Sequence, residues 1–124
     1  MTMSVDKYFT RVYRPGAYNC LHFAAEVWLD ITGHDLHDQL TSLMQFRLGD
    51  RSVERGHVRD FVVLEKPEDP CLVMMQRLRR VPHIGVWIRG SVLHLQARSG
   101  VQYMPLHVAA FGFERVRYFK PATA

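Results

Sequence analysis

The spacing of hydrophobic positions changes about halfway along the chain. Before Leu64 the apolar residues recur at intervals of three and four, whereas after Cys71 they form short runs separated by turn residues. The first spacing is typical of helices and the second of short strands. A helical half followed by an antiparallel meander predicts an α+β fold rather than a parallel α/β fold.

The first half predicts three helices. Residues 5–13 have the pattern of a short amphipathic helix, and residues 34–48 that of a longer one. Between them, residues 20–31 are apolar on almost every side, as expected for a buried central helix that Gly33 ends. Residues 58–64 fit either a short helix or a strand, and the pattern does not decide between them.

The second half predicts a sheet. The Arg89-Gly90 pair marks a tight hairpin turn, and Ser99-Gly100 marks the next turn. A short helical or irregular link is expected at residues 105–110. The predicted strands are residues 71–75, 82–88, 91–96, 101–104 and 113–119, the last of them closing the sheet.

Length and composition indicate one globular domain covering residues 1–124. Apolar residues make up 48% of the chain and charged residues 23%, which is ordinary for a folded domain. No run of about 18 apolar residues exists, so no membrane span is expected. Residues 1–10 lack the apolar stretch of a signal peptide, which predicts synthesis in the cytoplasm without one. Cys20 and Cys71 are expected to be free thiols, Cys71 as a buried strand residue.

The net charge of +4 suits an anionic partner or a basic surface with no particular partner. Arg77, Arg79, Arg80 and Arg89 gather around the predicted hairpin. No fold signature of nucleic-acid binding accompanies them. We therefore favour a solvated or protein-docking basic edge over a nucleic-acid site.

Cys20 begins the predicted central helix, directly after Asn19, a good N-cap residue. The positive end of a helix dipole favours the thiolate, the reactive form of cysteine. Cys20 is therefore a candidate nucleophile, and a buried structural cysteine is the alternative. His22, two residues further on, either contacts a substrate or points outward beside Glu26, which is one turn beyond it.

Two histidines of the predicted hairpin supply a candidate base. His83 begins one strand and His94 lies on the next, roughly opposite it across the turn. Cross-strand neighbours lie close together. If this pair packs on the Cys20 helix, one imidazole takes the thiol proton and the other orients it, while backbone N–H groups at the helix start stabilise an oxyanion. The alternative for His94 is a core histidine bonded to the backbone.

No metal or cofactor site is predicted. His34 and His37 are three residues apart, a spacing that can begin a metal site. No second pair with ligand spacing accompanies them, and a structural zinc site needs four ligands. A solvated helix start is the better interpretation.

Tyr18-Asn19-Cys20 resembles the Tyr-Asp-Cys box of the NlpC-type cysteine peptidases, papain-like enzymes that cut bacterial cell-wall peptides. The stretch from Pro82 to Ile88 is similar to that family's His-Val-Gly-Ile-Tyr strand, and His94 matches its next-strand histidine. The resemblance implies a papain-like fold, with N-terminal helices packed on a C-terminal antiparallel sheet or barrel. It also implies that Cys20 is the nucleophile, His83 the base and His94 its orienter, with Tyr18 shaping the oxyanion site.

By the same resemblance, the substrate is a peptidoglycan stem peptide and the reaction is that of a peptidase or amidase. A short catalytic domain of this kind is similar to those at the tips of tailed-phage tails. The implied partners are tail-tip or hub proteins, and the implied location is the virion tail.

The chain departs from the family at the helix start. The family usually has Asp before the cysteine and Ser-Gly after it, whereas here Asn19 precedes Cys20 and Leu21-His22 follow. This departure supports an alternative function, in which the protein is a structural tail-tip or assembly component with the same fold and a dispensable site.

Overall fold

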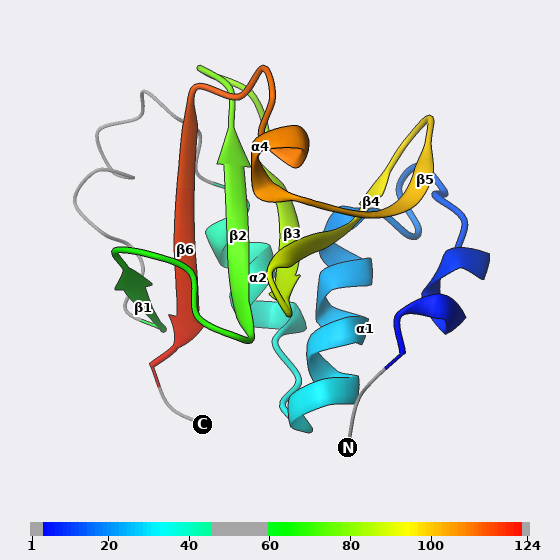
Figure 1. Cartoon of the computed structure of the whole chain (residues 1–124), viewed down its shortest axis with the longest axis horizontal. Coiled ribbons are helices and arrows are strands. Elements are labelled where there is room, and N and C mark those ends of the chain that lie inside the picture. The colour runs from blue at the N-terminus through cyan, green and yellow to red at the C-terminus, as the bar shows by residue number, and fades with distance from the viewer. Residues whose placement is uncertain (1–3, 46–59, 123–124) are drawn as a thin grey trace.

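A computed structural model describes residues 4–45 and 60–122 of the chain. Helices and an antiparallel sheet follow one another in chain order, as predicted for an α+β fold (Figure 1). The described elements are η1 (Asp6–Thr10), α1 (Cys20–Thr32), α2 (His37–Leu43), β1 (Phe61–Leu64), β2 (Cys71–Gln76), β3 (His83–Ile88), β4 (Ser91–Gln96), β5 (Gly100–Met104), α4 (Leu106–Ala109) and β6 (Arg115–Pro121).

The sheet has six strands in the order β1-β6-β2-β3-β4-β5. Strands β2 to β5 form the predicted meander of antiparallel neighbours. The last strand, β6, does not extend the meander at β5. It returns to the other side and pairs with both β2 and β1. Strand β1 also settles the open choice at residues 58–64, because Phe61–Leu64 is a strand.

Helix α1 has the predicted boundaries because its two ends are capped. The Asn19 side chain accepts hydrogen bonds from the backbone N–H groups of Leu21 and His22. At the other end Gly33 has a φ of 76°, the left-handed conformation that glycine adopts readily. These caps are local, and the sequence predicts them directly.

The flanking helical segments are shorter than their periodicity suggests. The predicted helix at residues 5–13 is a single stretch of 3-10 helix, Asp6–Thr10, which buries Tyr8 but leaves Phe9 half exposed. The predicted helix at residues 34–48 begins at His37 and gives way to a turn after Leu43. The predicted remainder of that helix, residues 46–48, lies outside the described residues.

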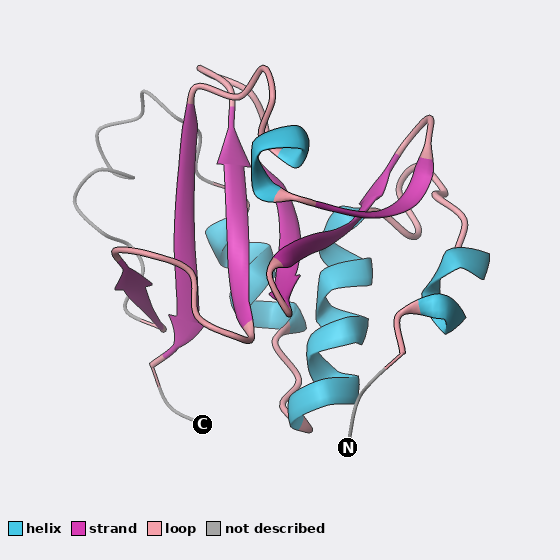
Figure 2. Cartoon of the chain, in the orientation of Figure 1, coloured by secondary structure: helices cyan, strands magenta, loops and turns pink. Residues whose placement is uncertain are grey.

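The alternation of side chains along β2 divides the core into two layers. Leu72 and Met74 face α1 and α2, whereas Val73 and Met75 face the other side, where α4 covers the sheet. Figure 2 shows α1 and α2 behind the sheet and α4 in front of it. The N-terminal end of α1 therefore meets the end of the sheet where β3 begins and β4 finishes.

The β3–β4 hairpin has the predicted two-residue turn. Arg89 has a φ of 49° and Gly90 a φ of 84°, and two positive values in succession are typical of the tight turn that suits a twisted hairpin. Ile88 then pairs with Ser91, and the register continues to Val86 opposite Leu93. This register determines where the two histidines lie.

Among the described residues, each helix is too short or too polar to cross a membrane.

Candidate active site

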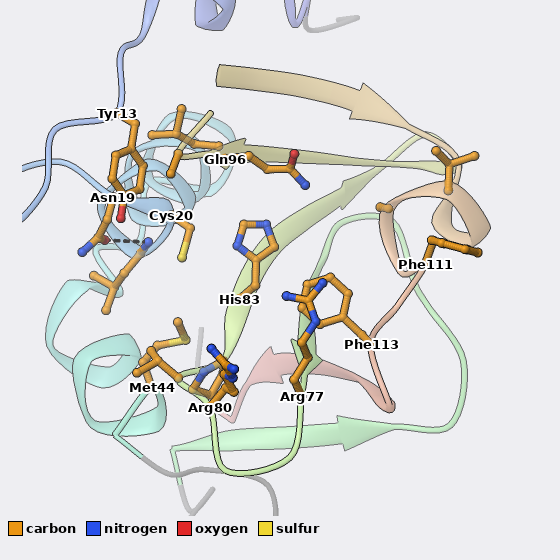
Figure 3. Close-up of a pocket in the computed structure, with 17 residues that line it drawn as sticks. Tyr13, Asn19, Cys20, Met44, Arg77, Arg80, His83, Gln96, Phe111 and Phe113 are labelled. Atoms are coloured by element: carbon orange, nitrogen blue, oxygen red, sulfur yellow. Dashed lines mark hydrogen bonds between the residues drawn. The ribbon is translucent and has the colours of Figure 1, made fainter. Parts of the chain in front are cut away.

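A pocket of about 760 Å³ lies where the start of α1 meets the end of the sheet. Its walls come from α1, the end of α2, the β2–β3 turn, the end of β4 and the α4 region, and Figure 3 shows Cys20 and His83 near its centre. The lining residues are Tyr13, Asn19, Cys20, Leu21, Met44, Arg77, Arg80, Val81, Pro82, His83, Leu95, Gln96, Ala97, Val108, Ala109, Phe111 and Phe113.

Cys20 is a free, partly buried thiol at the first position of α1. The backbone N–H group of Ile84 interacts with its sulfur. Because Ile84 directly follows His83, this contact joins the thiol to the start of β3. The Sγ atom points into the pocket toward the side on which the His83 imidazole lies (Figure 3).

His83 and His94 form a hydrogen-bonded pair. His83 Nε2 lies 2.7 Å from His94 Nδ1, and the ring centroids are 5.0 Å apart. The sequence predicted that the two residues are roughly opposite each other, and the register gives the exact offset. The register carries His94 opposite Gly85, so the pair is diagonal across the hairpin. The second nitrogen of the His83 ring is on the Cys20 side in Figure 3.

Gly85 makes this diagonal approach sterically possible. A Cβ atom at position 85 would lie 2.7 Å from Val92 Cγ1 and 3.1 Å from the Cβ atom of His94. Such distances are too short for ordinary contacts. The glycine therefore lets His94 pack against β3, where its side chain is completely buried.

Burial keeps the side chains of Cys20, His83 and His94 neutral near neutral pH. It lowers the pKa of His94 to about 4. Burial, followed by the influence of His94 and then Arg77, lowers the pKa of His83 to about 3. Burial also raises the pKa of the Cys20 thiol, and this outweighs the opposing effect of the backbone N–H groups of Ile84, Leu21 and Cys20. The predicted thiolate is therefore not the resting form.

Phe113 connects this histidine pair to an arginine. The Phe113 ring is stacked with the His83 ring at a centroid distance of 6.0 Å, and the Arg77 guanidinium carbon lies 4.3 Å from its centroid. Arg77 Nε also donates a hydrogen bond of 3.2 Å to the carbonyl of Gly112. The guanidinium group is thereby held at the edge of the pocket.

Tyr18 and His22, predicted to contact the oxyanion or the substrate, are not among the lining residues. The Tyr18 hydroxyl donates to Glu26, which also accepts hydrogen bonds of 2.9 and 2.6 Å from Arg11. His22 Nδ1 accepts from the backbone N–H group of Asn19, so that this ring completes the cap of α1. Both side chains thus support the helix start from outside the pocket.

Two kinds of lining residue were not among the predicted site residues. Tyr13 and Phe111 both line the pocket, and Phe111 is 85% exposed at its mouth. Arg77 and Arg80 were expected on a solvated edge. The signal available in the sequence was the position of both arginines just before Pro82-His83, since a turn that leads into the histidine strand must end beside the site.

The described residues contain no group of three or more His, Cys, Asp or Glu side chains arranged to hold a metal ion. His37 contacts His22 rather than His34, with ring centroids 5.3 Å apart. Neither a protein-family model nor a curated protein matches the chain.

Proposed function

We propose that this protein is a papain-like thiol hydrolase in which Cys20 attacks an amide carbonyl with help from His83 and His94. The observation that carries the proposal is the hydrogen bond of 2.7 Å between His83 Nε2 and His94 Nδ1 beside a thiol in the same pocket. A nucleophile, a base and a group that orients the base are the parts that acyl transfer through a thioester requires.

The proposed mechanism uses one of the two proton arrangements that the histidine pair allows. When His83 Nε2–H donates to His94 Nδ1, the remaining nitrogen of His83 presents a lone pair on the Cys20 side. Since the thiol and both imidazoles are neutral at rest, the thiol proton moves to His83 as the sulfur attacks. The imidazolium then protonates the departing amine, and a water molecule, deprotonated by His83, cleaves the thioester to release the carboxylic acid.

Two donors suit the oxyanion formed during attack. Asn19 caps the N–H groups of Leu21 and His22 but not that of Cys20, which remains directed toward the start of the helix. Tyr13 lines the pocket beside Asn19 and Cys20, and no described residue accepts its hydroxyl proton. Donors fixed in this way stabilise charge that develops in the transition state. Tyr13 thus takes the role first assigned to Tyr18.

The proposed substrate is a peptidoglycan stem peptide, and the proposed setting is a phage tail tip that helps a particle cross the cell wall. Both rest on the resemblance of Tyr18-Asn19-Cys20 and of the His83 strand to NlpC-type peptidases. The papain-like comparison rests on the helix-borne thiol facing a sheet-borne histidine pair.

The test is hydrolysis of purified stem peptides, followed by mass spectrometry of the products. Wild-type protein should cut one amide bond, and Cys20→Ala should leave every peptide intact. Cys71→Ala is the matched control, because Cys71 is a buried free thiol outside the pocket lining. Equal cleavage by wild-type protein and Cys20→Ala would refute the catalytic assignment.

The raised pKa of the Cys20 thiol favours one second candidate function. A protein retained as a structural tail-tip component needs the fold but not a reactive sulfur. Phage carrying Cys20→Ala separates the two functions. Normal plaques together with uncleaved stem peptides in the wild-type assay would favour the structural component.

A further inference from the structure

From the lining of the pocket we infer an anion-binding subsite beside Cys20, formed by Arg77 and Arg80, that selects substrates carrying a carboxylate or phosphate group near the scissile bond. The inference rests on the proposed hydrolase function and adds the chemical class of its substrate.

The β2–β3 turn delivers both arginines to one end of the pocket. The backbone N–H group of Arg80 donates a hydrogen bond of 3.1 Å to the carbonyl of Arg77, which folds the turn back on itself. Figure 3 shows both side chains below His83, between Met44 and Phe113. Two positive charges therefore share the compartment that contains the candidate nucleophile.

Arg77 is oriented in advance. Its Nε atom donates to the Gly112 carbonyl and its guanidinium lies over the Phe113 ring. These contacts use the Nε–H group of Arg77 and one face of its guanidinium. The two terminal nitrogens of the guanidinium remain for a ligand. A planar guanidinium held in this way suits the paired oxygens of a carboxylate or phosphate group.

No carboxylate of the described residues neutralises this corner. The lining includes two arginines and no Asp or Glu among the residues that the structure describes. Glu114, on the neighbouring turn, accepts a hydrogen bond from the backbone N–H group of Leu78. The described ion pairs do not include Glu114, Arg77 or Arg80.

Exposed apolar side chains also line the pocket. Val81, Val108 and Phe111 line it, and each is at least 49% exposed. Charged groups of a substrate therefore have their favourable place only at the arginine corner. An anion bound there would also offset the charge of Arg77, one of the influences that lower the pKa of His83.

The experiment compares two alkylating agents of similar shape and different charge, anionic iodoacetate and neutral iodoacetamide. Their rates of reaction with Cys20 are measured at one alkaline pH and assigned by peptide mass spectrometry, with N-acetylcysteine as the free-thiol reference. The wild-type ratio of the iodoacetate rate to the iodoacetamide rate should exceed the reference ratio. It should fall about threefold for each arginine replaced, the size expected for a unit charge about 7 Å away in water.

The variants are Arg77→Gln, Arg80→Gln and the double change, with Lys66→Gln as control. Lys66 is exposed on the β1–β2 loop and lies outside the pocket lining, so this control removes the same charge without altering the subsite. Arg77→Lys should keep a raised ratio. Arg80→Gln tests the idea even if Arg77→Gln fails to fold, because the Arg80 side chain is exposed.

A ratio equal to that of the free thiol, or unchanged in both arginine variants, would overturn the anion subsite. Protection of Cys20 by acetate or by inorganic phosphate decides which anion fits better. If Cys20 prefers iodoacetate but the protein does not hydrolyse stem peptides, the proposed hydrolase function is refuted and the anion subsite stands. If the protein hydrolyses stem peptides but Cys20 shows no preference for iodoacetate, the anion subsite is refuted and the hydrolase function stands.

Discussion

His83 and His94 share a hydrogen bond of 2.7 Å beneath a pocket, whereas His22 and His37 meet at the surface with ring centroids 5.3 Å apart. The inner pair comes from two strands, and burial lowers the pKa of both rings. The outer pair comes from two helices. His22 Nδ1 binds its own N-cap residue, and His37 stays 46% exposed.

The two pairs differ in the features that the proposed mechanism requires. Nearness is common to both pairs, but only the inner pair has a completely buried ring, a shared hydrogen bond and a thiol in the same pocket. One ring of the inner pair fixes the tautomer of the other. The outer rings mainly support the helix start. Substitutions in the two pairs should therefore have different effects.

The largest effect should come from His94→Ala. This change removes the acceptor that orients His83, so stem-peptide turnover should fall by about 10²- to 10⁴-fold, the usual contribution of positioned acid–base catalysis. His94→Asn should recover part of the loss, because its amide oxygen is able to accept from His83 Nε2–H. His22→Gln should leave turnover within about twofold of wild type, since Gln at this position keeps the helix cap. Equal losses in His94→Ala and His22→Gln would remove the distinction between the pairs.

Stability should depend on pH through the inner pair. The pKa of His94 is about 4 in the folded protein and 6.5 without burial. As pH falls from about 6.5 to about 4, the unfolded chain therefore binds a proton that the folded protein does not. The free energy of unfolding should decrease by about 1.4 kcal/mol per pH unit at the steepest point from His94 alone. Urea unfolding across this range measures the slope.

The matched comparison for the pH effect uses one variant from each pair. His94→Asn should make the slope shallower, because one of the two titrating rings is gone and only His83 still contributes. His22→Gln should change the slope less, since burial and His37 also lower the pKa of His22, but its ring remains partly exposed. A slope as steep in His94→Asn as in the wild-type protein would show that His94 does not contribute to the acid sensitivity.

Gly85→Ala should destabilise the protein by about 1–3 kcal/mol, the usual cost of overpacking a core. Its new methyl group would overlap Val92 and press on His94. Thermal unfolding gives the stability, and stem-peptide turnover should fall as well because His94 is displaced. Gly16→Ala is a useful contrast, since a Cβ atom there meets nothing within 4 Å although its φ is 74°. It should strain the backbone without affecting the histidines.

The smallest effect should come from Asn19→Ala, at about 1 kcal/mol of stability. The change removes the side-chain oxygen that caps Leu21 and His22. Asn19→Asp should keep the cap and preserve stability. Chemical unfolding of the two variants measures the difference. No loss in Asn19→Ala would mean that packing alone positions the start of α1.

The sequence by itself determined the parts of this protein that depend on neighbouring residues. Asn19 and Gly33 set the ends of α1, and Arg89-Gly90 sets the β3–β4 turn, because caps and tight turns depend on a few adjacent backbone angles. The α+β class was also predictable, because the hydrophobic spacing within each segment shows that helices come before strands. Hydrophobic periodicity predicted the helix lengths less well at residues 5–13 and 34–48. The helical segments there are shorter, Asp6–Thr10 and His37–Leu43.

Only the tertiary structure decided how distant segments combine. Strand β6 pairs with β2 rather than β5, and His94 lies diagonal to His83, because register is a property of paired strands. The fold also directs Tyr13 into the pocket and turns Tyr18 toward Glu26. Protonation is decided at this level too: a helix start suggests a thiolate at Cys20, but burial, which no single stretch of sequence reveals, raises its pKa instead.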